Sequence, residues 1–323
     1  MITAAILIAL WLTLNLIHGI WVGSRRLLWE KHIHRAANGL LPDADAYRIG
    51  NGPIALLFIH GFADTPCIWR RITQHLAAKE SFTCRAMRLP GSAEPAHFAK
   101  RQSLMRWRTG IADEIVRLHE THAHVWLVGH SMGGALALDA ARRNPEMVDG
   151  VIALAPMIDV SRKRCPLLPA RFWFRLARIA LSLSPTFESC FSAEGAAVDD
   201  PTFTYTRDRF IPFPVYGGLF ALIDANRNQA ARFNRPLFLV TSGRDSVVDS
   251  SAALRWGKAC KIPKEIREWP DVDHVIPLEI GWQKLVRRRR RLRSQALVFP
   301  FERRRLSALL RHAAGKLQGE QAV

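Results

Sequence analysis

Short apolar runs alternate with amphipathic stretches over most of the chain, from about Ala46 to Trp269. Runs of this length predict buried strands, and apolar residues at helical spacing predict the helices between them. The expected strands cover residues 53–59, 82–89, 125–128, 151–154, 237–240 and 266–269, and the expected helices cover 66–78, 104–118 and 131–143. Such alternation is typical of an α/β protein with a mostly parallel central sheet flanked by helices.

The alternation stops between Met157 and Arg235, a stretch too long for an ordinary connection. We therefore expect a helical cap inserted at residues 157–235. Apolar residues at helical spacing, with arginines between them, predict one amphipathic helix inside it; they are Phe172, Leu176, Ile179 and Leu183. This helix either covers a pocket or packs on the core as a plain surface helix.

The first 23 residues form an uncharged, mostly apolar run that is long enough to cross a bilayer as a helix. A cleaved signal peptide would carry a basic residue before the run, and none is present. Asn15 and His18 keep open the alternative of a buried helix in a soluble protein. Basic residues follow the run, so the positive-inside rule predicts a single-pass membrane protein whose downstream domain is cytoplasmic. Those residues are Arg25, Arg26, Lys31 and Arg35.

These patterns predict five parts: a transmembrane anchor at 1–23, a core in two pieces at 45–156 and 236–293, the cap at 157–235, and a tail at 294–323. The formal net charge is +18, and more than half of it lies in the last forty residues. Leu306, Leu309 and Leu310 recur there at helical spacing between arginines. The tail is either a basic amphipathic helix on an anionic membrane surface or a solvated charge run. It carries no nucleic-acid-binding motif, so we expect no nucleic acid partner.

Candidate chemistry begins at the segment GHSMG, residues 129–133, which stands between an expected strand and an expected helix. A sharp strand-to-helix turn of the form G-x-S-x-G exposes its serine as a nucleophile, and the small residues relieve backbone clashes. Gly129 and Gly133 meet that need, and Gly134 allows the helix to pack closely on the sheet. The alternative is a serine that merely caps the helix.

Three further segments support Ser131 as a nucleophile. The strand ending in His60-Gly61-Phe62 can supply a backbone amide to an oxyanion, and Met132, directly after the serine, can supply the second. We expect His60 and Gly61 to order that turn. Asp245 follows another strand end and is the candidate carboxylate, while we expect its rival Asp249 to cap a helix.

The last of these segments carries the candidate base, His274, in the loop after the final strand. Three other histidines crowd a helix end, and no carboxylate or cysteine clearly completes a metal set there; they are His119, His122 and His124. We expect neither a metal nor a cofactor. The five cysteines are scattered, as free thiols in a reducing compartment would be.

Taken together, HGF, GHSMGG, SGRDSVV and DHVIPLE resemble the α/β-hydrolase superfamily, in particular bacterial carboxylesterases and monoacylglycerol-lipase-like enzymes of the serine-aminopeptidase-like group. The resemblance covers about residues 45–290. It implies a catalytic triad of Ser131, Asp245 and His274, an oxyanion hole at Phe62 and Met132, and an inserted cap. The chain departs from the common pattern at Asp273, where many relatives have glycine or serine.

The expected activity is hydrolysis of carboxylic esters with aliphatic acyl chains, such as monoacylglycerols or lysolipids, through an acyl-enzyme. Peptide, amide or thioester cleavage and acyl transfer could use the same triad. A non-catalytic scaffold that binds anionic lipid through its tail is the alternative from a different class.

Overall fold

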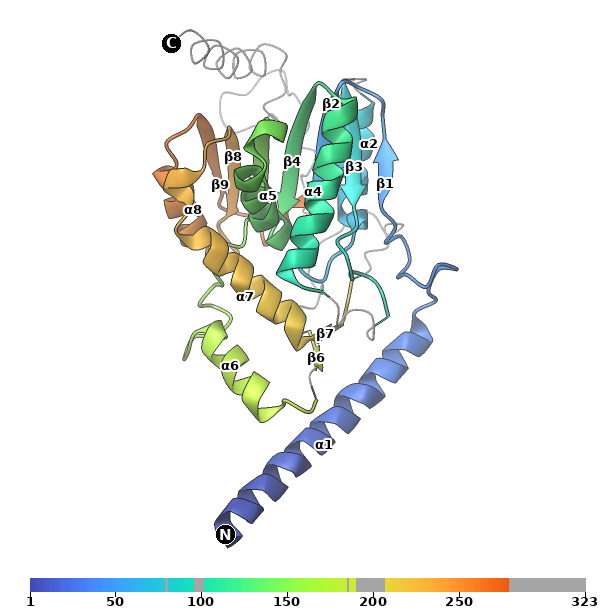
Figure 1. Cartoon of the computed structure of the whole chain (residues 1–323), viewed down its shortest axis with the longest axis vertical. Coiled ribbons are helices and arrows are strands. Elements are labelled where there is room, and N and C mark those ends of the chain that lie inside the picture. Colours follow the sequence, from blue (N-terminus) through green and yellow to red (C-terminus); the bar gives the residue numbers. More distant parts are fainter. Residues whose placement is uncertain (79–80, 96–101, 185, 190–206, 279–323) are drawn as a thin grey trace.

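The computed structural model describes residues 1–78, 81–95, 102–184, 186–189 and 207–278. Within them, seven strands form the central sheet, in the order β1-β3-β2-β4-β5-β8-β9 (Figure 1). The strands are β1 (Tyr47–Ile49), β2 (Ile54–Ile59), β3 (Phe82–Met87), β4 (His124–His130), β5 (Gly150–Leu154), β8 (Leu237–Ser242) and β9 (Lys264–Trp269). All neighbouring pairs are parallel except β1 with β3. The expected α/β-hydrolase fold is therefore confirmed.

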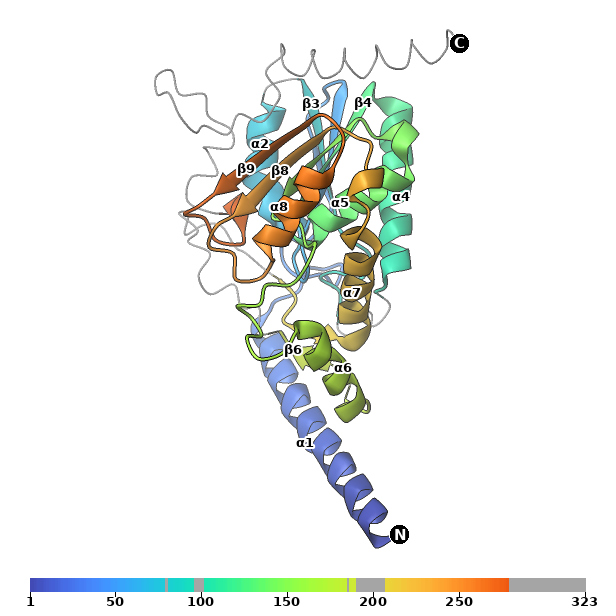
Figure 2. The ribbon, with the colours of Figure 1, turned by 90° about the vertical axis from the view of Figure 1, so that its left-hand side faces the viewer.

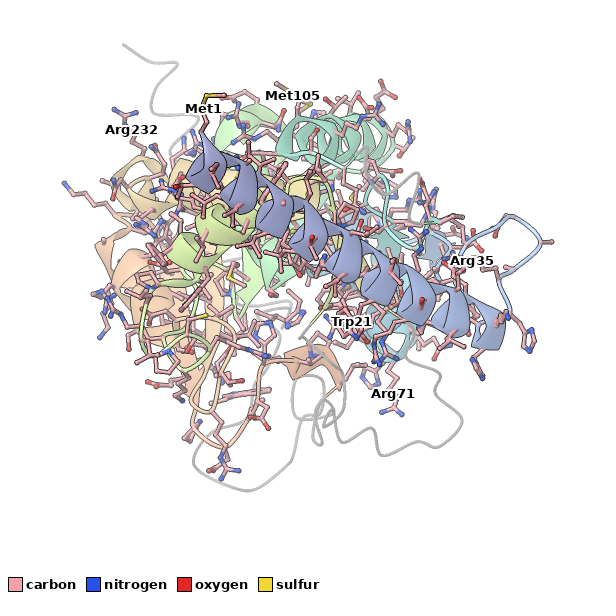
Figure 3. All side chains as sticks on the ribbon, turned by 90° about the horizontal axis from the view of Figure 1, so that it is seen from below. Met1, Trp21, Arg35, Arg71, Met105 and Arg232 are labelled. Atoms are coloured by element: carbon pink, nitrogen blue, oxygen red, sulfur yellow. The ribbon has the colours of Figure 1, made fainter. Side chains whose placement is uncertain are left out.

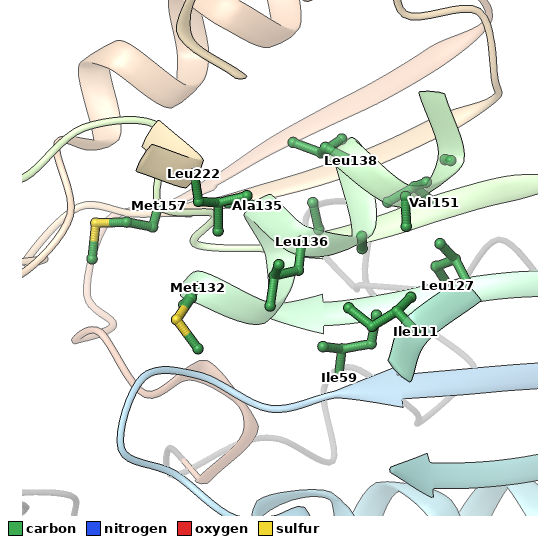
Figure 4. Close-up of a cluster of buried hydrophobic side chains, with 14 of the residues drawn as sticks. Ile59, Ile111, Leu127, Met132, Ala135, Leu136, Leu138, Val151, Met157 and Leu222 are labelled. Atoms are coloured by element: carbon green, nitrogen blue, oxygen red, sulfur yellow. The ribbon is translucent and has the colours of Figure 1, made fainter. Parts of the chain in front are cut away.

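Helices cover both faces of this sheet because the strands are apolar on both sides. In β2, Leu57 and Ile59 face one core, while Leu56 and Phe58 face the other. The first core is closed by α4 (Leu104–Thr121), α5 (Met132–Arg143) and α8 (Ser250–Ala259), and part of it is drawn in Figure 4. The second is closed by α2 (Arg70–Ala77). Burial on both faces explains why the strands are continuous apolar runs.

The segment expected to be a single cap divides into two parts. Its first part contains α6 (Ala170–Ala180) and β6 (Thr186–Glu188), and β6 pairs with β7 (Phe210–Pro212). Its second part, α7 (Phe213–Arg227), packs against α4 and α5. Leu222 and Ile223 of α7 are completely buried in the first core. Residues 213–227 therefore belong to the layer that covers the sheet, whereas α6 and β6 have no residue in the buried core.

The N-terminal apolar run forms one long helix, α1 (Ile2–His32), which continues beyond the expected end at residue 23. It projects from the body at the same end as α6 (Figures 1 and 2). By length and composition it could cross a membrane, and most of its apolar side chains are exposed. The expected tail at 294–323 lies outside the described residues.

Candidate active site

Ser131 occupies the turn between β4 and α5 in a strained backbone conformation, with φ of 55°. The neighbouring glycines are required because a Cβ at these positions would lie too close to neighbouring atoms. A Cβ on Gly129 would lie 2.2 Å from the Gly133 carbonyl oxygen, and a Cβ on Gly133 would lie 2.1 Å from that of Ile59. A Cβ on Gly134 would lie 3.1 Å from the nearest atoms, which belong to Pro156. Within the described structure the Ser131 hydroxyl does not cap α5. The turn thus has the backbone strain expected of a nucleophile elbow.

Gly133 is one of two elbow glycines at which a Cβ would clash with the backbone. In Gly133→Ala the new methyl group would meet the backbone at the end of β2, so we expect a loss of about 3 kcal/mol in the free energy of unfolding. Urea denaturation measures this. The matched control is Gly217→Ala in α7, whose Cβ would meet only Phe174 at 3.9 Å and which should gain about 1 kcal/mol. Equal stabilities of the two variants would contradict the packing argument.

His274 lies between Ser131 and Asp245. Its Nε2 is 2.9 Å from the Ser131 Oγ, and its Nδ1 is 2.8 Å from the Asp245 Oδ2. An ionised carboxylate only accepts hydrogen bonds, so Nδ1 carries the proton and Nε2 accepts from the serine hydroxyl. The three residues follow β4, β8 and β9, whose carboxyl ends meet at one edge of the parallel sheet. The structure thus brings all three predicted residues together.

Asp245 is held ionised at one end of this hydrogen-bonded series. Burial acts to raise the pKa of its carboxyl group, but the hydrogen bond and charge of His274 and two backbone N–H donors outweigh it, and the pKa is lowered. The donors are the amides of Val247 and Val248, each 2.8 Å from Oδ1. Asp249, the rival carboxylate, accepts instead from the Ala252 amide as the N-cap of α8. Its expected role as a cap is confirmed.

The loop after β2 passes close to the nucleophile. A Cβ added to Gly61 would lie 3.3 Å from the Ser131 Cβ, so Phe62 follows a residue that is near the serine. Met132 is the first residue of α5. The buried His60 donates from Nδ1 to the Gly61 carbonyl and accepts at Nε2 from the Leu89 amide. Burial lowers the pKa of His60 to about 4, so it is a neutral, turn-ordering residue.

His130, immediately before the nucleophile, was not singled out from the sequence. It is buried, and its Nε2 donates to the backbone carbonyl of His274 at 2.9 Å. Burial, followed by the charge of His274, lowers the pKa of His130 to about 4. Asp273, the departure from the family pattern, is exposed to solvent. The contact from His130 helps to fix the loop that carries His274, and no sequence pattern indicated it because the two residues are 144 positions apart.

A buried acid, Asp208, lies beside the loop after β2 and accepts a hydrogen bond from the Ala93 amide at 3.0 Å. Burial raises its pKa from 3.8 to about 7. The folded protein therefore holds this proton over a pH range in which the unfolded chain has lost it, and stability falls as pH rises through that range.

Replacement of Asp208 by asparagine should remove this pH dependence, because the amide oxygen can still accept from Ala93 and cannot ionise. We expect the melting temperature of the variant, relative to wild type, to increase between about pH 5 and about pH 8. Thermal unfolding at the two pH values measures the difference. A difference that does not change with pH would contradict the assignment.

An apolar cavity of about 280 Å³ lies between the inserted segment and α7. Its wall includes Met157, whose amide donates to the Ser131 carbonyl at 3.0 Å. It also includes Tyr216, whose ring centroid lies 5.1 Å from that of Phe62. Phe174 of α6 and Phe187 of β6 are among the other aromatic residues of the wall. A chain of methylene groups fits such a lining better than a charged group does.

Comparison with known proteins agrees with this geometry. A family model described as serine aminopeptidase, S33, matches residues 53–280. The chain belongs to this family of α/β-hydrolases. The sequence is 26% identical over 121 residues to a thermostable monoacylglycerol lipase of Bacillus sp. (strain H-257), a match that covers 38% of this chain and 48% of the lipase. The chain thus spans about half or less of the length of the curated relatives it matches.

Solved structures show the same fold in hydrolase-family proteins. A structure from the study of LipS and LipT, two metagenome-derived lipolytic enzymes, matches with a TM-score of 0.64 and 20% identity, over 76% of this chain and 95% of that one. The monoacylglycerol lipase of Paleococcus ferrophilus matches with a TM-score of 0.61 and 18% identity, over 74% and 93%. Neither match extends over the whole of this chain.

Proposed function

We propose that this protein is a membrane-anchored serine hydrolase that cleaves carboxylic esters with aliphatic acyl chains. The observation that carries the proposal is the continuous hydrogen-bonded series from Ser131 through His274 to the buried Asp245. This arrangement of nucleophile, base and carboxylate is what activates a serine hydroxyl near neutral pH.

In the proposed mechanism, Ser131 Oγ attacks the ester carbonyl carbon while His274 Nε2 takes the hydroxyl proton. Asp245 stabilises the resulting imidazolium. The amides of Phe62 and Met132 donate to the oxyanion of the tetrahedral intermediate. Its collapse breaks the ester bond, His274 protonates the departing alcohol, and Ser131 keeps the acyl group. A water molecule, deprotonated by His274, then releases the carboxylic acid.

The apolar cavity supports the proposed substrate class. Its lining is mostly apolar, and one of its wall residues, Met157, is hydrogen-bonded to the backbone of the nucleophile. An acyl chain in this cavity would place its ester at Ser131, while the alcohol would lie outside. A monoacylglycerol has this form, and the Bacillus relative is named for that substrate.

The localisation part of the proposal depends on α1. Its apolar length suits a bilayer, and Arg25 and Arg26 at the end of the apolar run favour a cytoplasmic catalytic domain. The basic tail would add attraction to anionic lipids.

A fluorophosphonate probe and a substrate panel test the proposal. We expect the purified full-length protein to be labelled, and to hydrolyse p-nitrophenyl esters and monoacylglycerols but not peptide amides. An unlabelled wild type would overturn the serine-hydrolase assignment. A labelled protein that cleaves amides or thioesters faster than esters would overturn the choice of substrate.

A further inference from the structure

One face of α1 is used for contacts inside the protein. The contacting residues recur every three or four positions and therefore lie along one stripe of the helix. They are Trp11, Asn15, His18, Val22, Arg25 and Trp29. Figure 3 shows α1 crossing the underside of the molecule, with Trp21 labelled on it. A helix that served only to tether the domain would need no such stripe.

Asn15 joins α1 to the end of α6. Its Nδ2 donates to the Ala180 carbonyl at 2.8 Å, and its Oδ1 accepts from the Leu183 amide at 2.9 Å. The last carbonyl groups of a helix have no partners within that helix, so Asn15 satisfies one of them for α6. Asn15 is only 4% exposed. A buried amide within an apolar helix is costly unless it is paired, and this pairing explains its presence in the run.

Further contacts connect α1 to the wall of the cavity. His18 lies 2.9 Å from the Ser184 hydroxyl, and its ring centroid is 5.4 Å from that of Phe187. Arg25 forms a bidentate ion pair with Glu188. Phe187 and Glu188 both line the apolar cavity whose wall includes Met157. The strand β6 therefore has α1 on one side and the cavity on the other.

The outer surface of α6 continues the exposed apolar surface of α1. Leu176, Ile179 and the following Leu183 are 46%, 71% and 60% exposed. They lie level with Trp11 and Asn15, inside the apolar run of α1, and Figures 1 and 2 show both helices at one end of the molecule. A bilayer that covers the apolar faces of α1 also covers these residues.

We propose that α1 is a clamp as well as an anchor: it fixes α6 and β6 against the apolar layer of the bilayer, so that an acyl chain passes from the lipid directly into the cavity. The proposal rests on the proposed function for its chemistry. It adds that the anchor supports the wall of the substrate site and that its role is not limited to localisation.

A cross-link tests the contact in the membrane-bound, full-length protein. A Cβ on Gly19 would lie 3.8 Å from the Ser184 Cβ, a separation suited to a disulfide. We expect the double variant Gly19→Cys/Ser184→Cys to form a disulfide on oxidation, detected by mass spectrometry of the linked peptides. Gly23→Cys/Ser184→Cys is the matched control, since a Cβ on Gly23 has no described atom within 4 Å. Equal disulfide yields for the two cysteine pairs would overturn the proposal that α1 is held against the end of α6.

A kinetic comparison tests the function of the clamp. Asn15→Leu removes both hydrogen bonds and keeps the helix apolar, and exposed Thr13→Leu is the control. We expect Asn15→Leu to lower kcat/KM for a long-chain monoacylglycerol roughly tenfold, because the two hydrogen bonds that join α1 to the end of α6 are lost. Hydrolysis of p-nitrophenyl acetate and fluorophosphonate labelling of Ser131 should stay within about twofold. Adding the oxidised Gly19→Cys/Ser184→Cys cross-link to Asn15→Leu should restore the long-chain rate.

Two outcomes of this comparison would overturn the clamp: Asn15→Leu and Thr13→Leu having the same long-chain rate, or the cross-link failing to restore it. Failure of the proposed function would be distinguishable, because the wild type itself would then lack labelling and acetate hydrolysis.

A third experiment tests whether the bilayer covers the outer face of α6. Ile179→Glu should slow hydrolysis of monoacylglycerol in anionic phosphatidylglycerol vesicles at least fivefold, because a charge would enter the apolar layer. Hydrolysis of soluble p-nitrophenyl butyrate should not change. If the wild type formed a dimer in detergent and Ile179→Glu dissociated it, a second copy of the protein would cover this face. That result would overturn the proposal that the bilayer covers it.

Discussion

Replacing Ser131 by alanine is expected to abolish fluorophosphonate labelling and to lower ester hydrolysis by roughly 10⁴- to 10⁶-fold. The variant loses the only proposed nucleophile, while His274 and Asp245 remain paired. Steady-state assays with p-nitrophenyl butyrate measure the fall in kcat. The fold should persist, because alanine fills the same position at the elbow with one atom fewer.

The control for this experiment is Ser103→Ala, which removes the N-cap of α4. It should cost about 1 kcal/mol of stability and leave hydrolysis unchanged. Labelling that survives in Ser131→Ala would assign the reactive group to another residue and would remove the basis of the proposed mechanism.

The chemistry of the candidate site was predictable because each part of it depends on a short local pattern. Gly129 is required by backbone contacts within a few residues of Ser131, and the G-x-S-x-G spacing identifies Gly133 although its close contact is with the end of β2. Asp245 and His274 each follow a strand, and in a parallel sheet the carboxyl ends of the strands share one edge. Local motifs and one rule of sheet geometry were therefore sufficient to bring these residues together.

The parts that were not predictable depend on contacts between distant segments. Asn15 and Leu183 are 168 positions apart, and nothing near Asn15 in the sequence indicates that it caps another helix. The division of the inserted segment at Phe213 has a similar cause. The helix α7 is apolar around much of its circumference, so its sequence does not show which side meets α5 and which meets the cavity.

The fixed orientation of the Asp245 carboxyl group makes a second large effect predictable. In Asp245→Asn, the side-chain oxygen should stay at the position of Oδ1, because the amides of Val247 and Val248 donate to that position. The new NH₂ group then points at His274 Nδ1 and donates to it. Nδ1 becomes an acceptor, so the proton moves to Nε2, which can no longer accept the proton of Ser131. The expected loss in kcat is about 10⁴-fold.

The matched control is Asp249→Asn, which makes the same chemical change four residues later. Asparagine is as good a helix N-cap as aspartate, so the bond from the Ala252 amide should survive and activity should stay within about twofold. Nitrogen-15 chemical shifts of the His274 ring provide an independent readout, since they distinguish the two tautomers. If Asp245→Asn kept most of its activity with the proton still on Nδ1, the carboxylate would only pack against the histidine and would not determine its tautomer.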